Sequence, residues 1–152
     1  ISALFTWHLI VAIIAQLPVA RLMKRFSHFV ALSISASAWA IGFICIWVTG
    51  VSSSYSIVWA ALALFLFALA IVSFTPSSAA FVSDIAPADK RGVYFSINSL
   101  CWAVGHFIGP PLGGWALDQS RFVVNSFWLS LAASVIVTIA ILRYLHRLIL
   151  RP

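Results

Sequence analysis

Uncharged, mostly apolar runs alternate with short charged segments along this chain. Asp, Glu, Lys and Arg are absent from four runs, residues 1–20, 26–83, 92–117 and 122–142. Because a helix needs about 20 apolar residues to cross a bilayer, the first, third and fourth runs each predict one transmembrane helix. The second run is long enough for two helices, and a turn-like Gly-Val-Ser-Ser-Ser cluster at residues 50–54 divides it. The pattern therefore predicts five helices, at residues 2–20, 29–49, 56–82, 93–117 and 123–143.

The composition places these helices in lipid. Hydrophobic residues make up 63% of the 152 residues and charged residues only 8%, whereas a soluble domain carries about 25% charged residues. In lipid every backbone polar group has to be satisfied internally, which helices achieve. The expected fold class is therefore all-α, a polytopic membrane helical bundle that forms a single transmembrane domain over residues 1–152. Its odd helix count predicts a fragment of a longer protein, because transporters are commonly built from paired repeats.

The basic residues predict how the helices are oriented. The net charge is +6, but the charges gather in loops of one side, which argues against a nucleic-acid partner. Eight of the nine basic residues fall on that side: Arg21, Lys24, Arg25, Lys90, Arg91, Arg143, Arg147 and Arg151. Arg121 falls on the other side. By the positive-inside rule, the first helix starts outside and the C-terminus is cytoplasmic, in a plasma (inner) membrane.

The motifs of common enzymes and metal sites are absent from the sequence. It has no CxxC, HExxH, Walker A or GxSxG pattern. Cys45 and Cys101 each fall inside a predicted helix and are interpreted as small core residues. We therefore expect no enzyme activity, no metal and no cofactor.

A few polar or aromatic side chains inside the predicted helices are candidates for a substrate pathway. They are Gln16, Asn98, Trp102 and His106. Asn98, Trp102 and Gly105 share one helix face, from which His106 is rotated by about 100° relative to Gly105. An intramembrane histidine is a functional candidate, and a hydrogen bond to a neighbouring helix is the alternative for His106. His8 is expected to lie at the outer interface.

Small residues and prolines predict how two helices pack and bend. The fourth predicted helix carries the helix-packing and kink motif Gly105, Gly109, Pro110, Gly113 and Gly114. Glycine faces let membrane helices approach closely, so this face should pack on another helix. Proline removes a backbone hydrogen bond, which predicts kinks near Gly109 and Pro76. The second predicted helix has a face of small residues at Ser33, Ala36, Ser37 and Ala40.

Two segments carry more specific motifs. Residues 84–92 read Asp-Ile-Ala-Pro-Ala-Asp-Lys-Arg-Gly, and residues 105–114 read Gly-His-Phe-Ile-Gly-Pro-Pro-Leu-Gly-Gly. In this order they resemble a loop and the following helix of major facilitator superfamily transporters, and the second resembles the motif of the drug–proton antiporter branch. The resemblance covers essentially the whole chain. It implies a partial fold of that family and secondary active transport by alternating access, in which two bundles rock around a central site.

The first loop bears on which part of such a transporter this chain is. Residues 16–26 occupy the place where the N-terminal half carries a G-x-x-x-D-R-x-G-R/K motif, but Ala20 stands at its acidic position and its glycines are missing. This resemblance implies helices eight to twelve of the C-terminal half, with the missing N-terminal half as a partner, and helices two to six as the alternative. The antiporter motif belongs to helix five, so its occurrence in helix eleven weakens the inference of drug export.

The same resemblance implies a charge latch at the cytoplasmic gate. Asp84 ends the third predicted helix, and the basic residues on its side are Arg21, Lys24, Arg25 and Arg91. An interfacial carboxylate needs a nearby cation, and in the family such pairs hold the gate closed. The alternative is a solvated carboxylate with no coupling role.

The resulting hypothesis is a secondary transporter that exports a drug-like or amphipathic small molecule through the lipid bilayer, with protons as the candidate coupling ion. Uptake of a sugar, amino acid or organic anion is one alternative, and a truncated membrane protein that no longer transports is another. No carboxylate lies inside a predicted helix. In a proton-coupled mechanism the titrating group would therefore be a histidine or lie in the missing helices.

Overall fold

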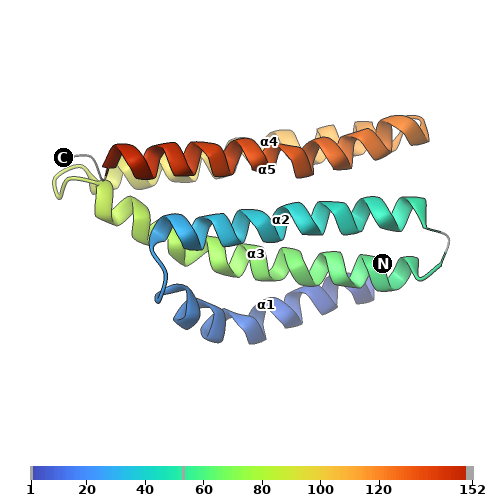
Figure 1. The fold of residues 1–152 in the computed structure, drawn as a ribbon, viewed down its shortest axis with the longest axis horizontal. Helices are drawn as coiled ribbons and strands as arrows, with labels where there is room; N and C mark the ends of the chain where they lie inside the picture. Colours follow the sequence, from blue (N-terminus) through green and yellow to red (C-terminus); the bar gives the residue numbers. More distant parts are fainter. Residues whose placement is uncertain (1, 53, 150–152) are drawn as a thin grey trace.

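Five α-helices make up the described part of the chain, residues 2–52 and 54–149 of the computed structural model (Figure 1). They are α1 (Ser2–Met23), α2 (His28–Val51), α3 (Ser56–Ile85), α4 (Arg91–Leu117) and α5 (Arg121–Ile149). Each predicted span lies inside one of these helices, so the helix count and order are confirmed. The match follows from the charge pattern, because the charged segments between the apolar runs lie at or near helix ends, although α5 continues past Arg143 to Ile149.

Four of the helices, α1, α2, α3 and α5, are long and apolar enough to cross a membrane. Large apolar side chains remain exposed along the bundle, such as Ile13 at 71% and Phe107 at 82%, as expected for surfaces that face lipid. The chain is thus an integral membrane protein. α4 has 27 residues, enough to span a bilayer, but its glycines, serines, Asn98 and His106 lower its hydropathy.

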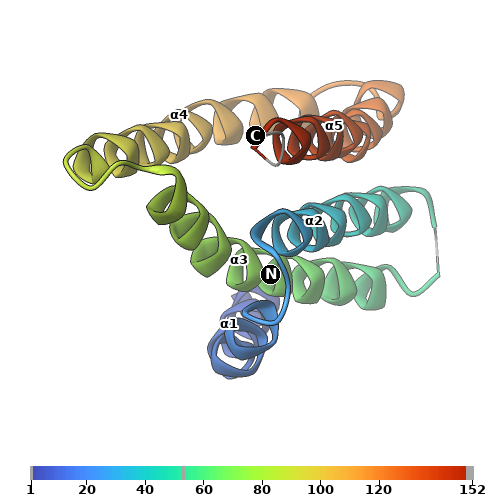
Figure 2. The ribbon, with the colours of Figure 1, turned by 60° about the vertical axis from the view of Figure 1, so that its left-hand side comes forward.

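The helices form two groups that are held together mainly by α2. α3 packs against both α1 and α2, and α2 also packs against α5. α4 makes only slight contacts, with α3 and α5. Figure 2 shows α4 and α5 forming one layer, and α4 diverging from α3 along its length. This divergence opens the space in which a cleft lies.

Small side chains allow α2 and α3 to approach closely. Ser35 of α2 and Ala70 of α3 are both 0% exposed, and the Ser35 hydroxyl donates a hydrogen bond of 2.8 Å to the Ala70 carbonyl. The buried positions of α2 are Ala31, Leu32, Ser35, Gly42 and Cys45. The predicted face at Ser33, Ala36, Ser37 and Ala40 is only half-buried. The observed contact is rotated away from it, because α2 carries small residues on more than one face.

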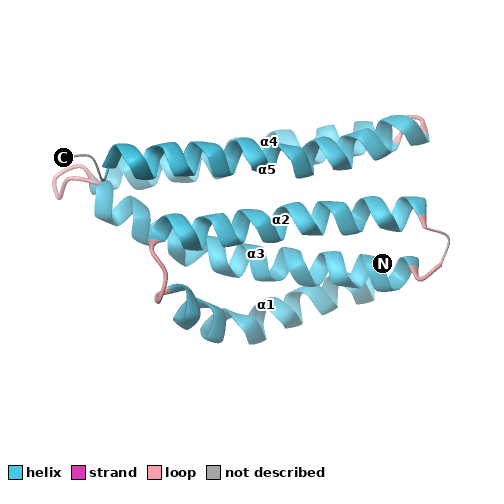
Figure 3. Cartoon of the chain, viewed as in Figure 1, coloured by secondary structure: helices cyan, strands magenta, loops and turns pink. Residues whose placement is uncertain are grey.

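Short loops and internal prolines shape the helices. Figure 3 shows the brief connections between helices. Pro18 lies inside α1 and Pro76 inside α3, and both helices change direction along their length (Figures 1 and 2). Since proline cannot donate the helical hydrogen bond, these bends have a local cause. α4 continues through Pro110 and Pro111, and the kink at Gly109 stays a prediction.

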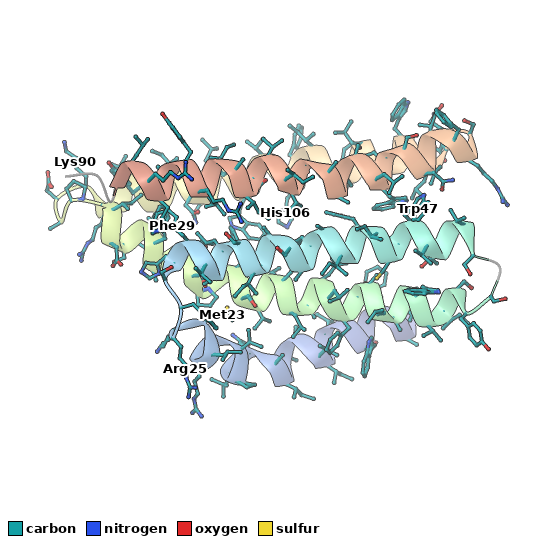
Figure 4. All side chains as sticks on the ribbon, in the orientation of Figure 1. Met23, Arg25, Phe29, Trp47, Lys90 and His106 are labelled. Carbon is teal, nitrogen blue, oxygen red and sulfur yellow. The ribbon has the colours of Figure 1, made fainter. Side chains whose placement is uncertain are left out.

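The two ends of the bundle differ in charge. The α1–α2 loop, the α3–α4 loop and the last turns of α5 lie at one end, here named the basic end (Figure 1). Arg151 is outside the described residues, and of the other eight basic residues all except Arg121 belong to the basic end. Figure 4 shows Arg25 and Lys90 there, with Trp47 towards the opposite end. The helix topology thus gathers on one side the charges that are dispersed along the sequence.

Candidate functional site

A cleft of about 870 Å³ lies between α2, α3, α4 and α5. α2 contributes Leu32, Ser35, Ala36, Trp39 and Phe43, and α3 contributes Phe74. The α4 wall consists of Asn98, Cys101, Trp102, Gly105, His106 and Pro110. α5 contributes Val135, Thr138 and Leu142. The cleft exists because α4 makes only slight contacts with α3 and α5.

Aromatic rings from three helices dominate the wall of the cleft. Phe74 of α3 meets Trp102 of α4 edge-to-face, with ring centroids 5.6 Å apart. Trp39 and Phe43, both of α2, line the same cleft, and their ring centroids are 6.0 Å apart. No Asp, Glu, Lys or Arg lines this cleft among the described residues. Uncharged, aromatic-lined concave surfaces favour flat or apolar molecules, which are oriented by a few polar groups.

The polar groups in the cleft differ in whether they are free to meet a ligand. The Ser35 hydroxyl donates its hydrogen to Ala70, and that of Thr138 donates to the Ser134 carbonyl at 3.2 Å. Asn98 makes no side-chain hydrogen bond within the described part of the chain. Asn98 and His106 are therefore the groups best placed to orient a bound molecule.

His106 lies over Trp102 on the cleft side of α4. Its Nδ1 is 3.0 Å from the Trp102 carbonyl oxygen, and the two rings have centroids 5.3 Å apart at 31°. Figure 4 shows His106 in the region between α4 and α2. Gly105 and His106 both line the cleft, although the sequence predicts that they point in different directions. The cleft is wide enough to receive both positions, although they are 100° apart in an ideal helix.

Gln16 lies in a different place from the other pathway candidates. It borders a separate cavity of about 440 Å³ between α1 and α3, together with Thr75 and Pro76. The structure therefore brings Asn98, Trp102 and His106 together and leaves Gln16 apart. The sequence contains no signal for this division, because it depends on which helices become neighbours.

The glycine face of α4 is open. A methyl group added at Gly105, Gly109, Gly113 or Gly114 would meet nothing within 4 Å. Within the described residues, this face therefore makes none of the close helix contacts predicted for it. Contact with helices outside this chain stays a prediction.

Asp84 is hydrogen-bonded to His28, a residue that the predicted latch did not include. His28 Nε2 lies 2.7 Å from Asp84 Oδ2, and the pair joins the start of α2 to the end of α3. Within the described residues no basic side chain of the predicted latch, Arg21, Lys24, Arg25 or Arg91, lies within ion-pairing distance of Asp84. The predicted latch includes only Lys and Arg as cations and therefore omits His28, which begins α2 on the same side.

A second histidine connects α2 and α5 at the basic end. The His146 ring packs on Phe29, with centroids 4.4 Å apart, and Phe29 also meets Phe81 of α3 at 5.2 Å. His146 Nδ1 is buried and has no hydrogen-bond partner among the described residues. A cavity of about 570 Å³ lies beside it and is also bordered by Arg143. Phe29 thus joins three helices near the Asp84–His28 pair.

His8 is half-buried, and its Nδ1 donates a 2.8 Å hydrogen bond to the Leu64 carbonyl of α3. Its place at the outer interface stays a prediction. Cys45 is buried as expected, whereas Cys101 is exposed on the cleft wall. The described residues contain no cluster of His, Cys, Asp and Glu suited to a metal ion.

The family of the chain follows from its sequence as a whole. No curated protein and no solved structure matches it. The family model described as Major Facilitator Superfamily matches residues 1–149, which include all five helices. This is a family of membrane transporters, in agreement with apolar helices around an uncharged cleft. The chain belongs to the Major Facilitator Superfamily.

Proposed function

We propose that this chain forms part of a secondary active transporter that exports a drug-like or amphipathic compound, and that the cleft between α2, α3, α4 and α5 receives that compound. The observation that carries the proposal is the lining of the cleft, which combines four aromatic rings with the polar side chains of Asn98 and His106 and contains no Asp, Glu, Lys or Arg among the described residues. Such a surface suits a molecule with an apolar aromatic body and a small polar part.

The same lining argues against the alternative substrates. A sugar needs many hydrogen-bonding side chains, and an organic anion is usually held by Arg or Lys. The cleft provides Asn98 and His106 and neither of those cations. Uptake of a sugar or an organic anion is therefore the weaker candidate. A protein that no longer transports is distinguished by the experiment below.

We also propose which part of the whole transporter this chain forms. The degenerate loop motif at residues 16–26 supports the C-terminal half, with these helices as numbers eight to twelve, and an N-terminal half as the partner in alternating access. Protons are the proposed coupling ion. Asp84 with Arg21, Lys24, Arg25 and Arg91 is the proposed latch at a cytoplasmic basic end, in a plasma (inner) membrane, and His28 holds Asp84 in the observed arrangement.

The test uses the complete reading frame that encodes the chain, expressed in inverted membrane vesicles, with transport of a fluorescent aromatic compound as the measurement. Trp102→Ala should raise KM about 2–10-fold, because an aromatic contact is worth about 0.5–1.5 kcal/mol beyond its buried area. Trp47→Ala is the matched control, because Trp47 lies outside the cleft lining. Equal effects of the two variants would contradict the proposal, and absence of transport would favour a non-transporting protein.

Cys101 offers a second readout of the same site. It is exposed on the cleft wall next to Trp102, whereas Cys45 is 4% exposed. The transported compound should therefore slow the reaction of Cys101 with a maleimide, and Cys101→Ser should abolish that labelling. Labelling that the compound leaves unchanged would place its binding elsewhere.

A further inference from the structure

We propose that a groove between α2 and α5 binds an anionic phospholipid from the membrane leaflet at the basic end, with the lipid phosphate at Arg143 and an acyl chain along α2. This groove, named the α2–α5 groove, is the cavity of about 570 Å³ beside His146. Of its lining residues only Leu142 also lines the cleft. The site is therefore separate from the one in which transport is proposed.

The α2–α5 groove opens at the apolar surface of the bundle. Val30, Ile34 and Ile41 of α2 border it and are 45%, 39% and 50% exposed. Ser33 and Ser37 also border it, and each hydroxyl donates its hydrogen to a carbonyl oxygen one turn earlier in α2. An apolar chain can therefore lie along α2 without leaving a hydroxyl donor unpaired.

The α2–α5 groove is about as long as one leaflet is thick. Its lining on α2 extends from Phe29 to Ile41, a distance of about 18 Å at the helical rise of about 1.5 Å per residue. Half of the hydrocarbon core of a bilayer is about 15 Å. Because α2 begins at the basic end, the groove extends from that end to the region of the midplane, as an acyl chain does.

Arg143 provides an uncompensated positive charge in this groove. The chain has nine basic and three acidic side chains, and within the described residues Arg143 makes no ion pair. A guanidinium group binds phosphate oxygens through two parallel N–H groups. Basic pockets between transmembrane helices are suited to lipid head groups for this reason.

Arg143 also borders a second hollow, which gives the site its preference for a phospholipid. This hollow has a volume of about 390 Å³ and is lined by Ile136, Tyr144 and Arg147 of α5 among others. Arg143 thus lies between two hollows, and a phospholipid has two acyl chains that leave one phosphate-bearing head. Arg147, four residues after Arg143, adds a second cation on the same helix face and favours an anionic head group over a zwitterionic one.

His146 adds a polar group where the α2–α5 groove begins. Its ring packs on Phe29 with centroids 4.4 Å apart, and Figure 4 shows Phe29 between α2 and α5 at the basic end. His146 Nδ1 is buried and has no hydrogen-bond partner among the described residues, whereas buried polar atoms are nearly always paired. The phosphate and ester oxygens of a lipid held at Arg143 lie at the same level and accept hydrogen bonds from an imidazole N–H.

Native mass spectrometry of the complete protein in detergent measures the lipid preference. The two probes are phosphatidylglycerol, which is anionic, and phosphatidylcholine, which is zwitterionic and carries the same chains. We expect the first phosphatidylglycerol to bind at least about fivefold more tightly, the effect of one basic residue on an anionic lipid. Arg143→Gln should remove this preference. Lys90→Gln removes a basic residue of the same end that lies outside both hollows, and this matched control should keep it.

Photo-crosslinking of the wild-type protein locates the lipid without any variant. Phosphatidylglycerol with a diazirine in one acyl chain should label peptides that contain residues 29–41 and 136–147. Excess inorganic phosphate should leave the labelling unchanged, because it has no acyl chain to occupy the groove. Equal affinity for the two lipids, a preference retained in Arg143→Gln, labelling confined to other helices, or displacement by phosphate would overturn the site. A dimer of the protein that closes the α2–α5 groove and excludes the lipid would do the same.

Discussion

Glycines of this chain occupy two opposite environments. A methyl group at Gly42 of α2 would lie 2.7 Å from Cδ1 of Phe67, and that ring is held by Trp39 and Phe43 at centroid distances of 5.1 Å and 5.3 Å. A methyl group at Gly113 of α4 would meet nothing within 4 Å. Only Gly42 is therefore required for packing within the described residues.

Replacement of Gly42 tests this difference. Gly42→Ala should destabilise the protein by about 1–3 kcal/mol, the scale of overpacking a well-filled core, and thus lower the midpoint of thermal unfolding in detergent. Gly113→Ala is the matched control and should be neutral or stabilise by up to about 1 kcal/mol, because alanine is the better helix former. Equal midpoints for the two variants would show that Phe67 moves aside freely.

At the scale of helices, contacts at the basic end join elements that are separate in sequence. The Asp84–His28 pair links α3 to α2, and Phe29 links α2 to both α3 and α5. The side chains of His28 and Asp84 are 37% and 66% exposed, and pairs this exposed contribute about 0–1 kcal/mol to stability. The pair therefore adds little to stability, and what distinguishes it is its position where α2 and α3 meet at the basic end.

Asp84→Asn should slow transport at least fivefold while the amount of protein in the membrane stays the same. The reason is that couplings between conformations involve about 1–3 kcal/mol, more than the pair contributes to folding. Transport by the complete protein in vesicles is the measurement, and Asp89→Asn in the neighbouring loop is the control.

The exchange Asp84→His with His28→Asp should restore transport if His28 is the partner, and rescue by a change at Arg21 or Arg91 would identify the basic loop instead. A wild-type rate in Asp84→Asn would mean a solvated carboxylate without a role in gating.

The whole molecule has one basic end and one end with few charges. Seven described basic residues lie at the first, in the two loops and in the last turns of α5, and Arg121 lies at the second. Because cytoplasmic loops of membrane proteins are enriched in Lys and Arg, the orientation of the entire bundle depends on this asymmetry.

Reporter fusions measure that orientation. A fluorescent protein that matures only in the cytoplasm should be bright when fused after residue 149 or in the loop at residues 24–27. It should be dark in the loop at residues 118–120, where alkaline phosphatase should instead be active. The reverse pattern would sink the assignment of the basic end to the cytoplasm.

Hydropathy is a property of each segment by itself, which is why the amino-acid sequence was enough to predict five helices and their order. The helix ends were predicted less closely, since α5 continues to Ile149, beyond the predicted residue 143. The charge asymmetry is likewise visible in the sequence alone, and the motifs at residues 84–92 and 105–114 were enough to indicate the family. Which face of a helix is buried depends instead on the shapes of side chains from other helices. Only the folded arrangement therefore revealed that Gly42 meets Phe67, that Asp84 pairs with His28, and that Asn98, Trp102 and His106 share a cleft from which Gln16 is absent.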